Sequence, residues 1–186
     1  MQSNALAALV RSTLLSGLSG LGSAYVDVQV RQVFQPSTVG NRSAPQITIQ
    51  FIGARRIGSL GRRYTPASPD PDEPMTGTML QWWETTLQVS ALARRNPEDP
   101  AFLSLPSALD ICKSASDILQ SDAGLAALAA QTVRPLRITD IRVVQWVNES
   151  DQYESMPNFD LVLVSPETLT TSTPPVATFE PVTGRV

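Results

Sequence analysis

Apolar residues near the start of the chain recur every three or four positions, and further along they recur every second position. The helical spacing joins Leu6, Leu9, Val10, Leu14, Leu18 and Leu21. It predicts an amphipathic helix over residues 4–17 that packs one face on a sheet and is ended by Gly17 and the glycines after it. Residues 25–31 and 47–51 alternate between apolar and polar side chains, which predicts two strands paired with each other.

Residues 79–93 show the same alternation and predict a third strand. Its two adjacent tryptophans point to opposite faces of such a strand. Trp83 shares its face with Leu87 and Val89, so we expect Trp83 in the core. Trp82 lies on the polar face, and we expect it to be exposed or covered by a partner, as interface tryptophans often are.

The second half of the chain predicts two helices and a hairpin. Ser107 and Asp110 have the spacing of a capping box, with Asp in place of the usual Glu. The helix that they open has a core stripe made of Ala108, Ile111, Cys112, Ala115, Ile118 and Leu119. A shorter helix follows over residues 122–131, and the alternation in residues 138–164 predicts two further strands that form a hairpin.

These elements predict an α+β fold with a mixed or antiparallel sheet of about five strands and helices packed on one face. We expect one domain over residues 1–165. Residues 53–78 interrupt it as a long inter-strand loop, basic in its first half and acidic and proline-rich in its second. A loop of this length is usually functional or disordered, and both a bridge to a neighbouring chain and a solvated hairpin tip remain open. Residues 166–186, rich in Pro and Thr, form an extended C-terminal arm.

The composition narrows the function. The chain of 186 residues contains no histidine, which removes the commonest catalytic base and zinc ligand. Its one cysteine, Cys112, has no partner for an internal disulfide and no histidine to activate it. A net charge of −3 weighs against a sequence-independent grip on nucleic acid. No apolar run approaches the roughly 20 residues that cross a bilayer. We therefore predict no catalytic, cofactor or metal site and no membrane contact.

A motif in the third predicted strand, with the order of elements around it, carries a family resemblance. The segment MLQWWETTLQV fits a degenerate Q-x-W-x4-Q-V pattern at Gln81, Trp83, Gln88 and Val89. A helical region rich in Ala, Leu and Asp follows at residues 107–130, and an NFDLVLV strand closes the domain at residues 158–164. In these features residues 1–165 resemble the tail-terminator and neck proteins of tailed bacteriophages.

The resemblance implies a non-enzymatic structural virion protein, located in the tail or neck and assembled in the host cytoplasm. Such proteins form a ring, usually a hexamer, that ends the tail tube and joins it to the head. The implied partners are other copies of the chain, the tail tube protein, the head-tail connector or collar, and the sheath as a further candidate. DNA only passes through the lumen.

We predict that the contacts of such a ring involve Arg55, Arg56, Arg62, Arg63, Trp82, Arg94, Arg95 and Phe179, and that deletion of residues 55–73 weakens assembly without unfolding the domain. Arginine dominates the cations of this chain and favours planar, partly desolvated pairs at interfaces. Two alternatives stay open. One is another morphogenesis part, such as a head-completion, collar or tail-tube protein. The other is a small monomeric binding module, which requires a deep pocket with converging polar groups.

Overall fold

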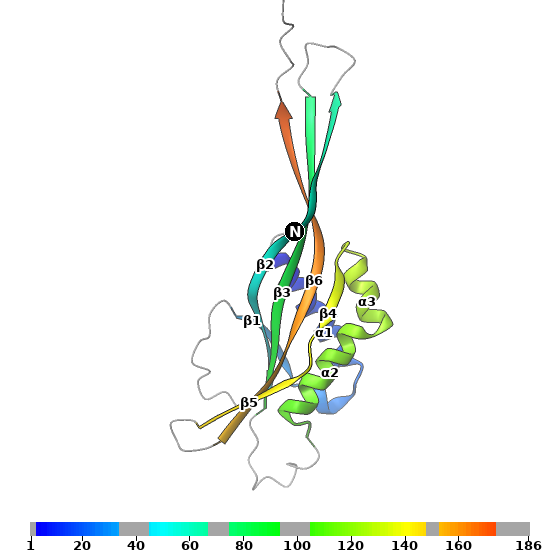
Figure 1. Ribbon diagram of the computed structural model, residues 1–186. Coiled ribbons are helices and arrows are strands. Elements are labelled where there is room, and N and C mark those ends of the chain that lie inside the picture. The colour runs from blue at the N-terminus through cyan, green and yellow to red at the C-terminus, as the bar shows by residue number, and fades with distance from the viewer. Residues whose placement is uncertain (1–2, 34–44, 67–74, 94–104, 148–152, 174–186) are drawn as a thin grey trace, which may run out of the picture.

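The computed structural model describes residues 3–33, 45–66, 75–93, 105–147 and 153–173. In these residues it shows a mixed six-stranded sheet and three α-helices, which confirms the predicted α+β class (Figure 1). Helices α1 and α2 pack on the sheet, and α3 packs against both of them and against β4. The helices contact one another, so they form one layer on one face of the sheet.

The order of strands across the sheet is β1-β2-β3-β6-β4, with β5 also paired to β6. β1 runs parallel to β2, and every other neighbouring pair is antiparallel. The strands are β1 (Gln29–Val33), β2 (Gln46–Pro66), β3 (Met75–Leu92), β4 (Arg134–Ile138), β5 (Arg142–Val147) and β6 (Tyr153–Thr173). The predicted pairing of the first two strands is confirmed, although β1 begins only after a short 3-10 turn, η1 (Ser23–Tyr25).

The helices are α1 (Ser3–Ser19), α2 (Ala108–Gln120) and α3 (Asp122–Ala129). The predicted capping box is confirmed at the start of α2. The Ser107 side chain accepts a hydrogen bond from the Asp110 N–H at 3.1 Å, and the Asp110 carboxylate accepts one from the Ser107 N–H at 2.8 Å. Gly17 was expected to end the first helix but lies inside it, where it faces Ile118 of α2.

The core lies between the helical layer and the covered face of the sheet. Apolar side chains from α1 and α2 meet alternate residues of β2, β3 and β6, which is the reason for the period of two in these strands. Its largest fully buried members are Phe159, Leu6, Leu14, Ile47, Ile49, Leu87, Ile111, Leu119, Leu128, Leu161, Leu163 and Val10. Cys112 is buried here too, as a small apolar core residue.

The structure corrects the prediction of a long loop at residues 53–78. Residues 53–66 continue β2, and residues 75–78 begin β3, with a ladder that reaches from Gln46 opposite Leu92 to Pro66 opposite Met75. β6 likewise crosses the predicted domain boundary at residue 165 and pairs with β3 as far as Thr173. The sequence did not predict these parts of the strands, because no core side chains impose an alternation of apolar and polar residues on them.

The outer parts of the three long strands form a projection that we call the blade. It consists of residues 57–66 of β2, 75–82 of β3 and 166–173 of β6. Figure 1 shows it extending upward beyond the helices. The sheet pairing thus continues where the helical layer has ended.

The candidate interaction surface

The register assigns the blade residues to two faces. β3 and β6 pair without a shift from Met75 opposite Thr173 to Ser90 opposite Asn158. Alternation along β3 therefore carries the core face of Leu87 outward to Met79, Gly77 and Met75. One blade face continues the covered face of the sheet, and the other continues its open face.

The first of these faces has a group of apolar side chains, with Arg62, Gln81, Glu167 and Thr171 on the same face, and we call it the apolar blade face. It carries Tyr64, Met75, Met79 and Leu169. Tyr64 and Leu169 are 55% and 56% exposed, far from the near-zero exposure of the core residues on the same strands. The Tyr64 ring lies over Gly77: a Cβ added at Gly77 would be 3.1 Å from Tyr64 Cε1 and 3.1 Å from Thr171 Oγ1. The missing side chain lets the ring lie across the central strand.

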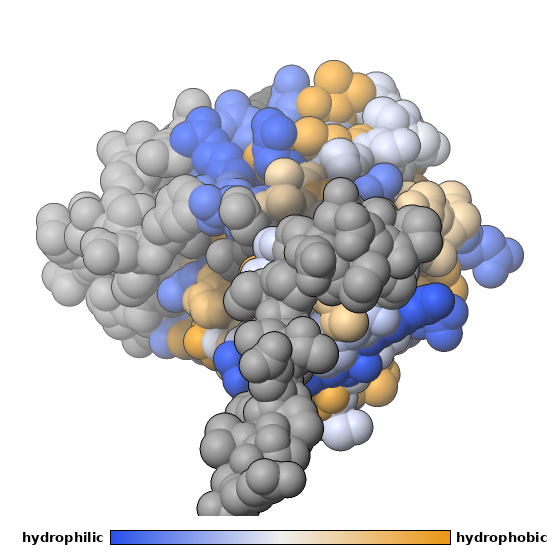
Figure 2. All heavy atoms as spheres, turned by 90° about the horizontal axis from the view of Figure 1, so that it is seen from above, coloured by the Kyte–Doolittle hydropathy of each residue, from blue (hydrophilic) through white to orange (hydrophobic). Residues whose placement is uncertain are grey.

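The second blade face is polar, with an apolar base. Thr65, Thr76, Thr78, Thr168, Thr170 and Ser172 line its outer part. At its base Trp82 lies between Ile57 and Pro166 in the ladder and is 38% exposed, which confirms the predicted exposure. In the view onto the blade end, apolar side chains reach the surface among hydrophilic ones (Figure 2).

Arg55, predicted as an interface residue, pairs within the chain. It lies opposite Glu84, and its Nε and Nη2 donate to the two carboxylate oxygens at 3.0 and 2.8 Å. The hydrogen bond to Glu84 and the charge of that carboxylate raise the pKa of Arg55. The Arg55 side chain is 73% exposed and that of Glu84 only 11%, so the pair lies at the surface with its acid partly covered.

Arg56 and Trp83 form a second internal contact on the opposite face. The guanidinium carbon of Arg56 lies 5.2 Å from the centroid of the Trp83 ring, in cation-π range. Trp83 was expected in the core. It is only half-buried, because the alternating buried residues of β3 in the sheet body, Leu87 and Thr85, end before it. Its Nε1 is buried and has no hydrogen-bond partner among the described residues.

Arg62 and Arg63 project from opposite faces of the blade, since they lie opposite Met79 and Thr78. Both side chains are exposed. Neither makes a hydrogen bond or an ion pair with the described part of the chain. These two cations are therefore available to a partner. The other three predicted contact residues, Arg94, Arg95 and Phe179, lie outside the described residues.

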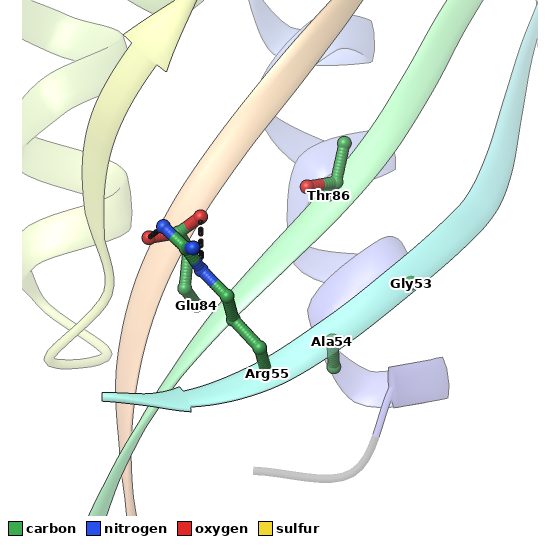
Figure 3. A pocket seen from close by; sticks show the side chains of 5 residues that line it. All are labelled: Gly53, Ala54, Arg55, Glu84 and Thr86. Atoms are coloured by element: carbon green, nitrogen blue, oxygen red, sulfur yellow. Dashed lines mark hydrogen bonds and ion pairs between the residues drawn. The ribbon is translucent and has the colours of Figure 1, made fainter.

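A shallow, open hollow lies beside the ion pair, and Figure 3 shows the five residues that line it. They are Gly53, Ala54, Arg55, Glu84 and Thr86. Its two charged groups are already paired with each other, so they do not converge on a ligand. Among the described residues no cluster of three or more acids and cysteines is placed to hold a metal ion. No helix in the described ranges is long and apolar enough to cross a membrane.

Sequence reasoning missed Tyr64, Met75, Met79 and Leu169 as surface residues. A signal for part of this set was present. The alternation of the third strand continues backward through Met79 and Met75, and that of the last strand continues forward through Leu169. Tyr64 follows two arginines and a run of glycines, with no such pattern.

One comparison with known proteins, the family profile, agrees with the sequence resemblance. The profile of the family described as E217 gateway protein gp29 matches residues 5–175. No curated protein matches the sequence. Among solved structures, the chain is similar to one from the PVC sheath/tube terminator of an extracellular contractile injection system in its extended state. Identity is 10% and the TM-score is 0.43, over 96% of this chain and 63% of that chain. This chain thus spans less than two thirds of that protein's length.

The family profile confirms the resemblance to phage tail-terminator and neck proteins. It indicates a structural component of the phage tail or neck. Because the profile covers residues 5–175 of the 186, the chain belongs to the family of the E217 gateway protein gp29.

Proposed function

We propose that this protein forms a closed ring of six copies, the usual number in tail-terminator proteins. The ring ends the tail tube of a phage and joins the tail to the head connector. The family supports a structural part at this location. The observation that carries the ring is the blade, a three-stranded extension that none of the described helices covers and that exposes apolar side chains. A narrow sheet open to water on both sides is marginally stable alone and gains stability when a partner covers it.

The proposed partners are other copies of the chain, the tail tube protein, the sheath and the connector or collar. Arg62, Arg63 and Trp82 are the described residues best placed for these contacts, because their side chains are exposed on the blade. Arg94, Arg95 and Phe179 remain proposed contacts on sequence grounds. DNA passes through the lumen, and the subunit supplies positioning surfaces without catalysis.

The native mass of the purified protein tests the ring. Light scattering should give about 121 kDa, six times the chain mass of 20.1 kDa, and negative-stain images of the same peak should show discrete rings. Long open tubes would favour a tail-tube protein instead. A chain that stays at 20.1 kDa at every concentration, and that does not cap tail tubes, would contradict the ring.

A shortened blade tests whether the blade carries assembly. Gly61 and Leu80 are paired, so residues 62–79 can be replaced by an Asn-Gly turn without a change of register. This cut is cleaner than removal of residues 55–73, which would take Arg55 and Arg56 away from the strand beneath. The shortened protein should unfold cooperatively and remain monomeric. As a matched control, a chain ended after Phe179 keeps every described blade residue and the proposed contact at Phe179, and it should retain the blade-dependent assembly.

A further inference from the structure

The apolar blade face lies on the same side of the sheet as the helices, beyond their end. This follows from the unbroken register of β3 with β6, which carries the face of Leu87 and Leu161 outward to Met79 and Leu169. Under the helices this face is fully buried, while on the blade Tyr64 and Leu169 are more than half exposed. The sheet therefore continues its covered face onto the blade, where no helix of the described ranges lies on it.

A helix of a second copy of the chain can supply the layer that the described helices of the first copy do not supply over the blade. A sheet face of this kind is buried in stable folds against a helix or another sheet. Helix α3 lies at the outside of the helical layer, and among its residues only Gly124 and Leu128 are buried. Leu125 is 37% exposed, and the neighbouring alanines are exposed with it. Small side chains let a helix approach a flat strand surface closely.

The charges of the two surfaces are complementary. Arg62 lies on the apolar blade face and has no partner in the described ranges, while Asp122 begins α3 and Asp117 lies nearby on α2. Both aspartates are exposed, and neither makes an ion pair within the part of the chain that the structure describes. The blade face also carries one exposed acid, Glu167, and α2 carries one exposed lysine, Lys113. Opposite charges at the rim of an apolar contact set its register.

We propose that the apolar blade face of one copy receives α3 of the next copy, with Arg62 facing Asp122 and Asp117. The eight residues of α3 span about 12 Å, and the stretch of β3 from Met75 to Gln81 spans roughly 20 Å, so the helix fits on the blade. The two surfaces differ, so the contact is heterologous and repeats from copy to copy until a ring closes. This inference rests on the proposed ring and names the surfaces that build it.

Cross-linking of introduced cysteines tests the contact and its direction. Leu125→Cys and Leu169→Cys are prepared separately in the full chain, mixed, and treated with a short bis-maleimide. Cys112 is buried, and burial raises the pKa of its thiol to about 12, so it does not compete. The mixture should yield a covalent dimer that neither variant yields alone. A dimer from Leu169→Cys alone would show that two blades pair with each other and would overturn the inference.

The remaining outcomes separate this contact from the ring itself. Rings of the mixed variants that yield no cross-linked dimer would overturn the α3 contact and leave the ring standing. A wild-type chain that is monomeric under every condition, and that does not cap tubes, contradicts both.

Charge reversal supplies an independent readout. Arg62→Glu should raise the dissociation constant of the assembly by at least about tenfold, and Asp122→Arg in the same chain should restore much of the loss. Arg31→Glu is the matched control, because Arg31 is an exposed arginine on β1, outside both the blade and α3. An equal loss for Arg62→Glu and Arg31→Glu, or no rescue by Asp122→Arg, would contradict the pairing. Urea unfolding of each variant establishes that the domain is folded.

Discussion

Gly17 of α1 lies directly against Ile118 of α2, with no room for a side chain between them. A Cβ added at Gly17 would be 2.4 Å from Ile118 Cγ2, 2.7 Å from Cγ1 and 2.9 Å from Cδ1. The close approach brings the two helices together on the sheet and explains why a glycine is tolerated inside α1. It also fixes where α2, and the α3 that follows it, lie over the sheet.

Gly17→Ala should therefore destabilise the fold. A β-branched side chain in a helix has few alternative rotamers, so Ile118 cannot move aside without a shift of the helix. We expect a loss of about 1–3 kcal/mol in the free energy of unfolding, as in other overpacked cores, even though Ala is the better helix former. Urea unfolding measures it. Ser16→Ala, at the exposed neighbouring position, should be close to neutral, and a neutral Gly17→Ala would show that the helices can separate at little cost.

The blade should open locally far more often than the rest of the same strands. Residues 76–80 of β3 pair with both neighbouring strands but lie beyond the helices, whereas residues 86–90 of the same strand lie in the sheet body under them. Amide hydrogen exchange of the monomer should be at least about tenfold faster in the first segment. In the assembled protein the difference should shrink, because a neighbour then covers the blade. Equal protection of the two segments in the monomer would mean that the blade needs no partner.

The sequence predicted the body of the fold because burial imposes a pattern on it. The alternation of Ile47 and Ile49, and of Leu87 and Val89, exists because one face of each strand meets the helices. The capping box at Ser107 was also predicted, because it depends only on two residues that lie three positions apart in the chain. β4 was missed because Pro135 interrupts it and Leu136 is exposed, so no alternation marks a buried face.

The candidate site was harder to predict, because its strands are specified by pairing alone. The sequence favoured Arg55 as a cation for an interface, but only the register shows that Glu84 of the same chain lies opposite it. Arg62 and Arg63 looked alike in sequence, and the structure assigns them to different faces. A residue whose partner is remote in the chain, or belongs to another chain, leaves no periodic signal near itself.

Burial of Cys112 makes the stability of the fold sensitive to alkaline pH. Loss of hydration at the buried thiol raises its pKa from 9.0 to about 12. The folded state keeps this proton while the unfolded state releases it, so the stabilisation is complete below pH 9 and is lost as the pH rises from 9 to about 12. Comparison with Cys112→Ala cancels other titrations. The stability advantage of the wild type should be constant from pH 7 to 9 and then fall by up to about 1.4 kcal/mol per pH unit. An advantage that stays constant to pH 11 would contradict this account.

The capping box couples the start of α2 to the stability of the whole helical layer. Ser107 and Asp110 satisfy each other's backbone N–H groups, which the first turn of the helix leaves without partners. Ser107→Ala removes one of these acceptors and should lower the free energy of unfolding by about 1 kcal/mol. Ser107→Thr keeps the hydroxyl and should restore most of the loss. Thermal unfolding of the three proteins measures the effect. If Thr destabilised as much as Ala, the shape of the side chain at this position, rather than the hydrogen bond, would stabilise the start of the helix.

α2 leads directly into α3, so a weakened cap should also loosen the surface that we assign to the contact with the neighbouring copy. Ser107→Ala should then form rings less readily than Ser107→Thr at the same protein concentration.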